Sequence, residues 1–514
     1  MNAATADSQD GGVALSSIGG LDPAALFPFP LDDFQLEAVA ALNQGHSVVV
    51  SAPTGSGKTL IGEYAIHRAL AHGQRVFYTT PLKALSNQKL RDFREQFGAD
   101  RVGLMTGDLT ANREAPIVVM TTEIFRNMLY AEIEDGDDPL EGVEAVVLDE
   151  CHYMNDSQRG TVWEESIIHC PPAIQLVGLS ATVANAGQLT DWIEQVHGPA
   201  DLIVSDFRPV PLQFSFCSAK GLHPLLNDKG TGLHPNCKVW RAPKGHHRRG
   251  KNPKPPQPEP PSMGFMVAQL VERKMVPAIV FLFSRRGCDK AVRDLIKASL
   301  VNEQEARELR LALEEFAQTS PEAVRDGIHA EALLRGVAAH HAGVLPAWKE
   351  LIEQLFQRGL VKVVFATETL AAGINMPART TVISALSKRT ENGHRPLMAS
   401  EFLQMAGRAG RRGLDTQGYV VTMQSRFEGV REAGQLATSP PDPLVSQFTP
   451  SYGMVLNLLQ RYELPKAKEL VERSFGRYLA TLDLAEDQSR IAELRQQLEL
   501  LGETVPDVPW EDFE

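Results

Sequence analysis

Ser47-Val-Val-Val-Ser-Ala-Pro-Thr-Gly-Ser-Gly-Lys-Thr59 is a β-branched run that passes directly into a glycine-rich turn. The residues that follow, Thr59–Leu70, have the spacing of a helix. A strand, a glycine-rich turn ending in Gly-Lys-Thr and a helix, in that order, form the context in which a P-loop binds nucleotide phosphates. Ala52 stands where the first glycine of this pattern usually lies. The stretch therefore predicts a nucleotide-binding α/β domain.

The residue types in this turn suit phosphate chemistry. Gly55 and Gly57 allow backbone N–H groups to close around phosphate oxygens, and the following helix adds the positive end of its dipole. Lys58 is placed to reach the β- and γ-phosphates, and the Thr59 hydroxyl is placed to hold Mg²⁺. The predicted phosphate-binding set is Pro53, Thr54, Gly55, Ser56, Gly57, Lys58 and Thr59.

A second apolar run is followed by two adjacent acidic residues. Ala145-Val-Val-Leu-Asp149-Glu150-Cys151-His152 is an apolar run that ends in two adjacent carboxylates. Asp149 at the edge of a sheet can hold a metal ion through its water shell, and Glu150 can accept the proton of an attacking water. Adjacent Cys151 and His152 have no further Cys/His pair at ligand spacing, so we do not expect a zinc site. The sequence predicts a hydrolase that uses Mg²⁺.

The second half of the chain carries arginines that could face the nucleotide from another domain. Gln404-Met-Ala-Gly-Arg-Ala-Gly-Arg-Arg-Gly413 places Gln404 and Arg408 four residues apart on a helical stretch, with Arg411 three residues further. Arginines that face the γ-phosphate from another domain act as arginine fingers, which stabilise transition-state charge when the cleft is closed. We therefore predict Lys58, Asp149, Glu150, Gln404, Arg408 and Arg411 as the catalytic set.

Apolar runs alternate with helical stretches on both sides of these elements. Such continuous runs are typical of strands buried on both faces of a parallel sheet. The alternation predicts an α/β protein with two tandem doubly wound parallel-sheet domains, at 26–205 and 263–430, preceded by a disordered tail at 1–25. The predicted strands are Ser47–Val50, Arg75–Thr79, Ile117–Met120, Ala145–Leu148 and Gln175–Leu179, then Ala278–Phe283, Gly336–Ala339, Val361–Phe365, Thr380–Ile383 and Gly418–Met423.

Composition narrows the class of protein. The chain of 514 residues has 51 Lys and Arg against 64 Asp and Glu, a formal net charge of −13. An acidic chain gains no general affinity for nucleic acid, so phosphate contacts must come from locally concentrated cations. The five cysteines include no CxxC pair, which excludes a disulfide scaffold or zinc ribbon and indicates a reducing cytoplasm. We expect neither a membrane span nor a secretory signal.

The ordered motifs of the chain resemble those of superfamily-two DExH-box helicases, and within them the superkiller-type RNA helicases associated with RNA-degrading exosomes. The resemblance runs from about Phe29 to Ala480 and implies two RecA-like domains, ATP and Mg²⁺ as cofactors, and a partial winged helix with the foot of a coiled-coil stalk in 431–514. It rests on Phe29–Gln35, the P-loop, Thr80–Lys89, Leu104–Asp108, Met120–Arg126, Asp149–His152, Gly160–Glu165, Ser180–Thr182, Arg208–Gln213, His340–Gly343, Ala366–Pro377 and Gln404–Gly413.

The resemblance also implies roles for single residues. Phe29 would stack on adenine, Gln35 would bond to its edge, and Gly373 would join the nucleotide-binding set. Ser180 and Thr182 would couple the nucleotide state to strand contacts. The RNA-contacting groups would hold phosphate and sugar without reading bases. They are Thr79, Pro81, Lys83, Gly107, Thr121 and Thr122 in the first domain, and Ser284, Arg285, Gly343, Thr367 and Thr369 in the second.

The 206–262 region is predicted to be a linker with a basic, proline-rich insert. Residues 230–258 contain no acidic side chain, and six prolines lie between Pro253 and Pro261. We favour an extended spacer, with an RNA-contacting loop as the alternative. The insert's seven cations are Lys238, Arg241, Lys244, Arg248, Arg249, Lys251 and Lys254.

The resemblance implies an ATP-dependent RNA helicase that translocates 3′→5′ and unwinds or remodels RNA in processing or decay. Single-stranded RNA or a 3′-tailed RNA duplex would be its substrate, and a nuclease or exosome-like assembly its partner. A DNA helicase of related architecture is one alternative, because no residue by inspection reads a 2′-hydroxyl. An ATP-gated RNA-binding remodelling subunit that does not unwind duplexes is the other. The family continues past a winged helix through an arch to a helical ratchet bundle, and this sequence holds only the start of the winged helix and the foot of the stalk. Processive unwinding by this chain alone therefore stays open.

Overall fold

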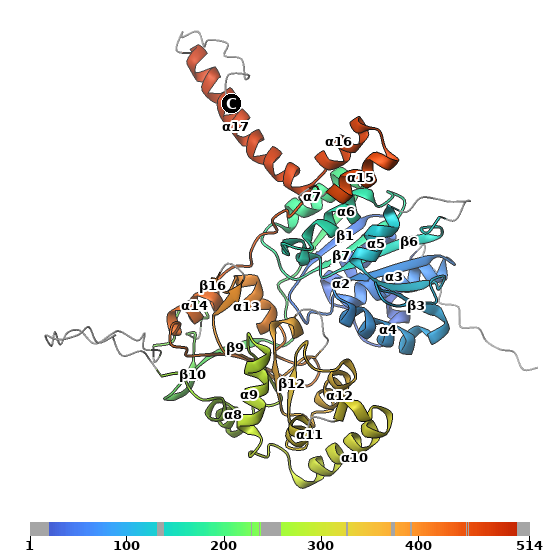
Figure 1. Ribbon diagram of the computed structural model, residues 1–514. Coiled ribbons are helices and arrows are strands. Elements are labelled where there is room, and N and C mark those ends of the chain that lie inside the picture. Colours follow the sequence, from blue (N-terminus) through green and yellow to red (C-terminus); the bar gives the residue numbers. More distant parts are fainter. Residues whose placement is uncertain are drawn as a thin grey trace, which may run out of the picture.

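Two α/β domains and a following helical segment make up the computed structural model, which describes residues 20–130, 138–227, 229–235, 237, 259–324, 327–371, 376–390, 393–448, 450 and 452–500. The predicted fold class of two tandem doubly wound domains is confirmed (Figure 1). Gly373 and most of the basic insert, 238–258, lie outside the described residues.

In the first domain, eight described strands form one sheet in the order β4-β3-β5-β2-β6-β7-β1-β8. All neighbours are parallel except β3 and β4. The parallel pairing brings the carboxyl ends of the strands to one edge, where the P-loop follows β1 and the acids follow β6. The strands are β1 (Ser47–Ser51), β2 (Arg75–Thr80), β3 (Val102–Met105), β4 (Thr110–Ala111), β5 (Ile117–Thr121), β6 (Val143–Asp149), β7 (Gln175–Ser180) and β8 (Ala200–Val204).

Helices cover both faces of this sheet. Alternate residues of one strand enter opposite cores: Val48 and Val50 of β1 pack with α2 and α3, whereas Val49 belongs to the core that contains α5, α6 and α7. Strands buried on both faces must be apolar throughout, which explains why their sequence signal is continuous. The helices are α1 (Pro23–Leu26), α2 (Asp33–Asn43), α3 (Thr59–Ala71), α4 (Lys83–Phe97), α5 (Thr122–Leu129), α6 (Gly160–His169) and α7 (Ala186–Val196).

The second domain has the same layered plan. Its described strands form a sheet in the order β10-β9-β17-β14-β11-β13-β12, in which only β9 and β10 are antiparallel neighbours. One face packs on α8 and α9 and the other on α10, α12, α13 and α14. The strands are β9 (Leu212–Ser218), β10 (Gly221–Pro224), β11 (Ala278–Phe281), β12 (Val337–His340), β13 (Val363–Ala366), β14 (Thr380–Ile383) and β17 (Gly418–Met423). The helices are α8 (Met263–Glu272), α9 (Arg285–Leu295), α10 (Glu303–Thr319), α11 (Gly327–Leu333), α12 (Pro346–Gln357), α13 (Ala399–Ala406) and α14 (Val430–Thr438), and a separate hairpin pairs β15 (Ser387–Thr390) with β16 (Gly393–Pro396).

Every strand predicted from an apolar run is present, with ends that shift by one or a few residues. The region predicted to be a linker, 206–262, contains two strands of the second domain. They are β9 and β10, which extend the second sheet beside β17. The connection between the two sheets is therefore residues 205–211, since β8 ends at Val204 and β9 begins at Leu212.

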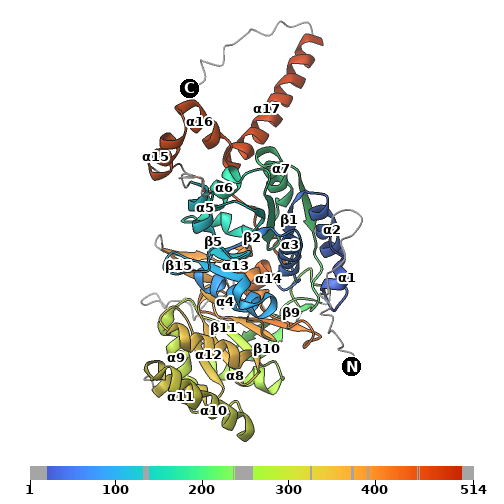
Figure 2. The same cartoon turned by 90° about the vertical axis from the view of Figure 1, so that its right-hand side faces the viewer.

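The chain after the second domain returns to the first. Leu444, Met454, Leu470 and Phe475 join the apolar core that contains α6 and α7, and Phe475 lies 5.3 Å from Trp192 between ring centroids. Helices α15 (Tyr452–Arg461) and α16 (Leu464–Glu472) lie there, and α17 (Phe475–Leu500) points away from both domains (Figures 1 and 2). The winged helix and the coiled coil stay predictions. None of the described helices has both the length and the apolar character to cross a bilayer.

Candidate functional site

The P-loop connects β1 to α3 and faces the second domain. Gly55 and Gly57 have φ angles of +84° and +94°, a left-handed backbone that side chains rarely adopt, so the turn requires glycine at both positions. Lys58 Nζ donates to the carbonyls of Ala52 at 2.6 Å and Pro53 at 2.9 Å. Burial lowers the pKa of Lys58 to about 8, against the opposing effect of Glu150 and Asp149. The loop thus holds its lysine folded back on its own carbonyls.

Several groups around this loop suit a bound nucleoside triphosphate and metal ion. The Ser56 and Ser180 hydroxyls are buried and have no hydrogen-bond partner among the described residues. A buried hydroxyl without a partner is costly, so a polar ligand at this position would stabilise both. The Lys58 ammonium and the Thr59 hydroxyl lie on the same turn. The residues present therefore fit phosphate and metal binding.

Of the two residues predicted to contact adenine, Phe29 precedes α2 and Gln35 lies within it. Phe29 is 48% exposed, so its ring is available for stacking. Gln35 is buried; its Nε2 donates to Gly57 O at 2.9 Å, and its Oε1 accepts from the Asp32 N–H at 2.9 Å. Gln35 therefore ties the first turn of α2 to the P-loop.

The two acids at the end of β6 differ in environment. The Tyr78 hydroxyl donates to Asp149 Oδ2 at 2.8 Å. Burial and the neighbouring Glu150 raise the pKa of Asp149. Burial alone would also raise the pKa of Glu150, but His152, Lys58 and Arg408 outweigh it and lower that pKa. Glu150 therefore lies among cations as a carboxylate, the form in which it can accept a proton.

Glu150 also has an unusual backbone. Its φ of +56° and ψ of +46° lie in the left-handed region. For a residue other than glycine this conformation costs energy, and such residues concentrate at functional sites. The turn places Glu150 between β6 and the short 3-10 helix η2 (Cys151–Asn155), with His152 Nδ1 3.4 Å from Glu150 Oε2.

Two predicted catalytic residues of the second domain reach this site. Gln404 Nε2 on α13 lies 3.2 Å from His152 Nε2. Arg408 is buried; its guanidinium donates twice to Ala371 O, at 3.1 and 2.6 Å. Glu150 and Asp149 lie close enough to act on the pKa of Arg408, which burial lowers. The cleft thus brings the acids of one domain beside the cations of the other.

The two arginines that follow are placed differently. Arg411 is bound to Asp415 by two hydrogen bonds of 2.8 and 2.9 Å, and Asp415 also accepts from Arg379. Arg412, which the sequence did not single out, approaches the P-loop: its Nη1 lies 3.4 Å from Ser56 O, and its Nη2 lies 3.2 Å from Asp32 Oδ2. In this arrangement Arg412, rather than Arg411, contacts the nucleotide-binding loop.

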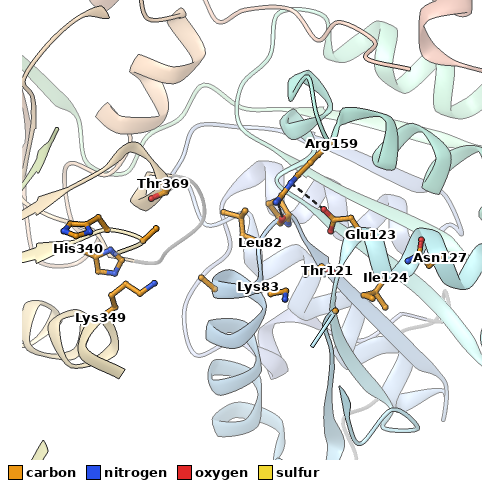
Figure 3. A pocket seen from close by; sticks show the side chains of 15 residues that line it. Leu82, Lys83, Thr121, Glu123, Ile124, Asn127, Arg159, His340, Lys349 and Thr369 are labelled. Atoms are coloured by element: carbon orange, nitrogen blue, oxygen red, sulfur yellow. Dashed lines mark hydrogen bonds and ion pairs between the residues drawn. The ribbon is translucent and has the colours of Figure 1, made fainter. Parts of the chain in front are cut away.

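A groove of about 570 Å³ lies between the two domains. Figure 3 shows Lys83, Thr121 and Arg159 on one side of it and His340, Lys349 and Thr369 on the other. Arg159 Nη1 donates to Pro81 O at 3.0 Å, and Arg159 also lies 3.8 Å from Glu123. Predicted RNA-contacting residues in the lining are Pro81, Lys83, Gly107, Thr121 and Thr369. The lining also includes Leu82, which lies inside the predicted contact stretch from Thr79 to Lys83. Residues of the lining to which the sequence reasoning gave no contact are Ala84, Glu123, Ile124, Asn127, Arg159, His340, His341, Ala342 and Lys349.

The remaining predicted RNA contacts do not line this groove. Thr79 and Thr122 are fully buried, and the Thr122 hydroxyl donates to Thr80 O at 3.3 Å. Ser284 caps α9 by accepting from the Gly287 N–H at 3.0 Å. Three others stand near the groove's second-domain side: the Thr367 hydroxyl lies 2.9 Å from that of Thr369, and a Cβ on Gly343 would lie 3.8 Å from Arg285 Cδ.

The segment predicted to couple the nucleotide state to strand contacts begins at the end of β7. Ser180 ends β7, and Thr182 follows it two residues later. The intervening Ala181 N–H donates to His152 Nδ1 at 3.3 Å. This segment therefore contacts the same imidazole that approaches Gln404.

Two residues near the acids were missed in the sequence. Tyr78 orients Asp149, and Lys89 Nζ donates to Thr59 Oγ1 at 3.3 Å while lying 5.2 Å from the centre of the Tyr78 ring. The available signal for Tyr78 was a hydroxyl-bearing side chain on the buried strand β2, although Thr79 and Thr80 share that property. Lys89 lies on α4, the helix that begins at Lys83 in the groove, so one helix contacts both sites.

Comparison with known proteins agrees with this geometry. The profile described as DEAD/DEAH box helicase matches residues 32–189, and the one described as helicase conserved C-terminal domain matches residues 268–413. A chloroplastic DExH-box ATP-dependent RNA helicase of Arabidopsis thaliana is 45% identical over 97% of this chain and 47% of its own length. The probable helicase HelY of Mycobacterium tuberculosis is 44% identical over 89% of this chain and 52% of its own length.

Superkiller complex protein 2 of Homo sapiens is 39% identical over 94% of this chain and 40% of its own length. The chain thus spans about half the length, or less, of these curated relatives. The matched profiles cover both α/β domains and include the P-loop, the Asp149–His152 box and the Gln404–Gly413 stretch. The chain therefore belongs to the DExH-box helicases, in the superkiller-type branch of the DEAD/DEAH box family.

Proposed function

We propose that this chain is the ATP-hydrolysing and RNA-translocating part of an ATP-dependent RNA helicase that moves 3′→5′ on single-stranded RNA. The observation that carries the proposal is the groove between the two domains, because its walls come from both of them. The same two domains also meet at the P-loop through Arg412 and at His152 through Gln404. A strand bound in such a groove must respond when the domains move relative to each other.

The chemistry follows from the residues of the cleft. The P-loop backbone and Lys58 bind the phosphates of ATP, and Glu150 accepts the proton of the attacking water. Mg²⁺, held by Thr59 and Asp149, would neutralise phosphate charge. Arg408 lies within electrostatic range of Glu150 and stabilises negative charge that develops as the phosphate bond breaks.

The groove suits a nucleic-acid backbone that is held without base readout. Lys83 and Lys349 supply cations from opposite domains, while Thr121 and Thr369 supply hydroxyls. These groups bind phosphate and sugar and carry no sequence information. The acidic net charge of the chain makes this local concentration of cations necessary.

A partner that is a nuclease or exosome-like assembly and a role in RNA processing or decay stay predictions from the resemblance. A cytoplasmic location stays a prediction from the cysteine content. Human Superkiller complex protein 2 is by its name a member of a complex, which supports a search for a protein partner of this chain.

Strand displacement tests the proposal. We expect ATP-dependent release of a labelled strand from an RNA duplex with a 3′ single-stranded tail, and none from the same duplex with a 5′ tail. Equal activity on a 3′-tailed DNA duplex would favour the DNA helicase. RNA-stimulated hydrolysis without displacement of either strand would favour the remodelling subunit.

A further inference from the structure

Arg208 lies in the middle of the connection between the two sheets, residues 205–211. The start of this connection is tied to the first sheet, because the Ser205 N–H donates to Ser51 O at the end of β1 at 3.0 Å. Its end is tied to the second sheet, because the Gly418 N–H at the start of β17 donates to Pro211 O at 2.9 Å. Pro209 and Pro211 restrict the backbone on either side of Val210. Arg208 is therefore held at a nearly fixed place between the domains.

The guanidinium of Arg208 joins three separate parts of the chain. Nη1 donates to Thr54 O in the P-loop at 2.8 Å, and Nε donates to Val210 O in the connection at 3.0 Å. Nη2 donates to Gly407 O at 3.0 Å and to Ala409 O. Gly407 and Ala409 flank Arg408, the residue that faces the acids. One side chain thus binds the P-loop and the Arg408 segment at the same time.

The surrounding packing makes this contact close. A Cβ on Gly407 would lie 2.8 Å from Thr54 Cβ, and a Cβ on Gly410 would lie 2.6 Å from Val210 Cγ1. The P-loop, the connection and the Arg408 segment therefore meet where only glycine fits. Arg208 supplies the polar part of this three-way contact.

The charge of Arg208 has no carboxylate partner in the described part of the chain, since all its hydrogen bonds there go to backbone carbonyls. Burial accordingly lowers the pKa of Arg208 to about 10. Two other arginines of limited exposure are paired with acids: the buried Arg68 binds Glu144, and the half-buried Arg411 binds Asp415. Keeping an unpaired cation in a partly buried position is costly, which argues that its location matters for function.

We propose that Arg208 is a positioning residue, which sets the distance between the P-loop and Arg408 and thereby acts on turnover through Arg408. The planar guanidinium holds its donors at fixed separations, so carbonyls of both domains can accept from it together in one relative placement of the domains. A lysine or glutamine cannot reproduce that fork. The inference rests on the proposed function for its effect on turnover, but the domain placement it describes does not depend on RNA.

The test compares Arg208→Gln and Arg208→Lys with a matched control, Arg75→Gln. Arg75 also donates to backbone carbonyls, those of Arg113 and Ala115, but all of them lie within the first domain. For each protein we would measure ATP affinity, kcat at saturating ATP and poly(A), and Tm. We expect both Arg208 variants to lower kcat by about 10²-fold, the scale of a small misplacement of reacting groups, with ATP affinity nearly unchanged. Arg75→Gln should keep the wild-type kcat.

A second measurement does not need activity. Spin labels at Asp100→Cys in the first domain and Lys290→Cys in the second, in a Cys237→Ser background, report the distance between domains in the nucleotide-free protein. We expect one narrow distance distribution with Arg208 present and a broader one in both Arg208 variants. An unchanged distribution would overturn the inference, and so would a kcat that stays at the wild-type value, as is expected for Arg75→Gln. Loss of ATP affinity at unchanged kcat would also overturn it. A wild-type protein without ATPase activity would contradict the proposed function. The distances between the spin labels would still show whether Arg208 fixes the placement of the domains.

Discussion

Gln404 Nε2 of the second domain lies 3.2 Å from His152 Nε2 of the first. The other ring nitrogen of His152 lies 3.4 Å from Glu150 Oε2 and accepts from the Ala181 N–H at 3.3 Å. One imidazole therefore contacts Glu150, which is the predicted general base, the Ser180–Thr182 segment and the opposite domain. Movement of α13 relative to the first domain must change the surroundings of Glu150, which gives domain closure a direct route to the hydrolytic step.

Gln404→Ala removes this cross-domain contact and leaves Glu150, Lys58 and Arg408 in place. We expect the stimulation of ATPase activity by RNA to be largely lost, with the rate without RNA within about threefold of wild type, because only the closed cleft uses the contact. Steady-state ATPase assays with and without RNA provide the measurement. Gln188→Ala, at an exposed glutamine of α7, is the control and should keep full stimulation. If RNA stimulates Gln404→Ala as strongly as the wild type, the contact does not couple RNA binding to ATP hydrolysis.

Glu150→Gln keeps the size of the side chain and removes the proton acceptor. We expect kcat to fall by about 10²- to 10⁴-fold, the usual contribution of a general base, while ATP affinity stays within a few-fold of wild type. Equilibrium binding of a fluorescent ATP analogue and single-turnover hydrolysis separate the two quantities. If affinity and kcat fall together, Glu150 holds the metal ion or the fold instead. Glu141→Gln, an exposed acid in the loop before β6, is the matched control.

Arg411 is predicted from the sequence to act as a finger, and in the structure it is bound to Asp415. Arg411→Ala and Asp415→Asn both break this ion pair, but only the first removes the guanidinium. We expect Arg411→Ala to lower kcat at saturating ATP and RNA by about 10³-fold, the lower range for an arginine finger, without weakening ATP binding to the first domain. Asp415→Asn should lower Tm and keep kcat.

An equal, small decrease of kcat in both variants would show that Arg411 only serves Asp415. In that case Arg412, whose Nη1 lies 3.4 Å from Ser56 O, becomes the residue to replace next.

Replacing the insert's seven cations by Gln tests the spacer against the RNA-contacting loop. We expect RNA affinity and its salt dependence to stay unchanged, because a spacer releases no counterions when RNA binds. Titrations of labelled single-stranded RNA at several salt concentrations give the slope. A clearly flatter slope than wild type would make the insert part of the RNA path. The variant replaces Lys238, Arg241, Lys244, Arg248, Arg249, Lys251 and Lys254.

Much of the fold could be predicted because its signals are local. Strand β1 and helix α3 follow from an apolar run, a glycine-rich turn and helical spacing that are contiguous in the sequence. Strand β9 lies inside the region predicted to be a linker, because that prediction rested on the composition of the basic, proline-rich insert that follows it. Its place in the sheet depends on pairing with β17, about 200 residues away in the sequence, which no local pattern reveals.

The residues of the candidate site likewise fall into two groups, those with a local sequence signal and those whose position depends on the fold. The P-loop and the acids could be found because each is a short run at the end of a strand. Arg159 and Lys349 line the groove only because two domains meet there, so neither stands out in the sequence. Arg208 was visible only as part of a family motif, since the carbonyls it binds come from the P-loop, the connection and the Arg408 segment. Arg411 and Arg412 are adjacent in the sequence and have different contacts. The difference depends on the folded position of Asp415, which binds Arg411.

The measurement that tests the central claim most directly is the rate of ATP hydrolysis with no nucleic acid, with poly(A) and with single-stranded DNA of matched length. The claim is that one cleft, shared by two domains, couples the P-loop to a groove that holds RNA. It predicts a low basal rate, a large increase in kcat with poly(A), a smaller increase with DNA, and no activity in Lys58→Ala under any condition. An ATPase rate that is the same with and without poly(A), in protein shown to bind RNA, would contradict it.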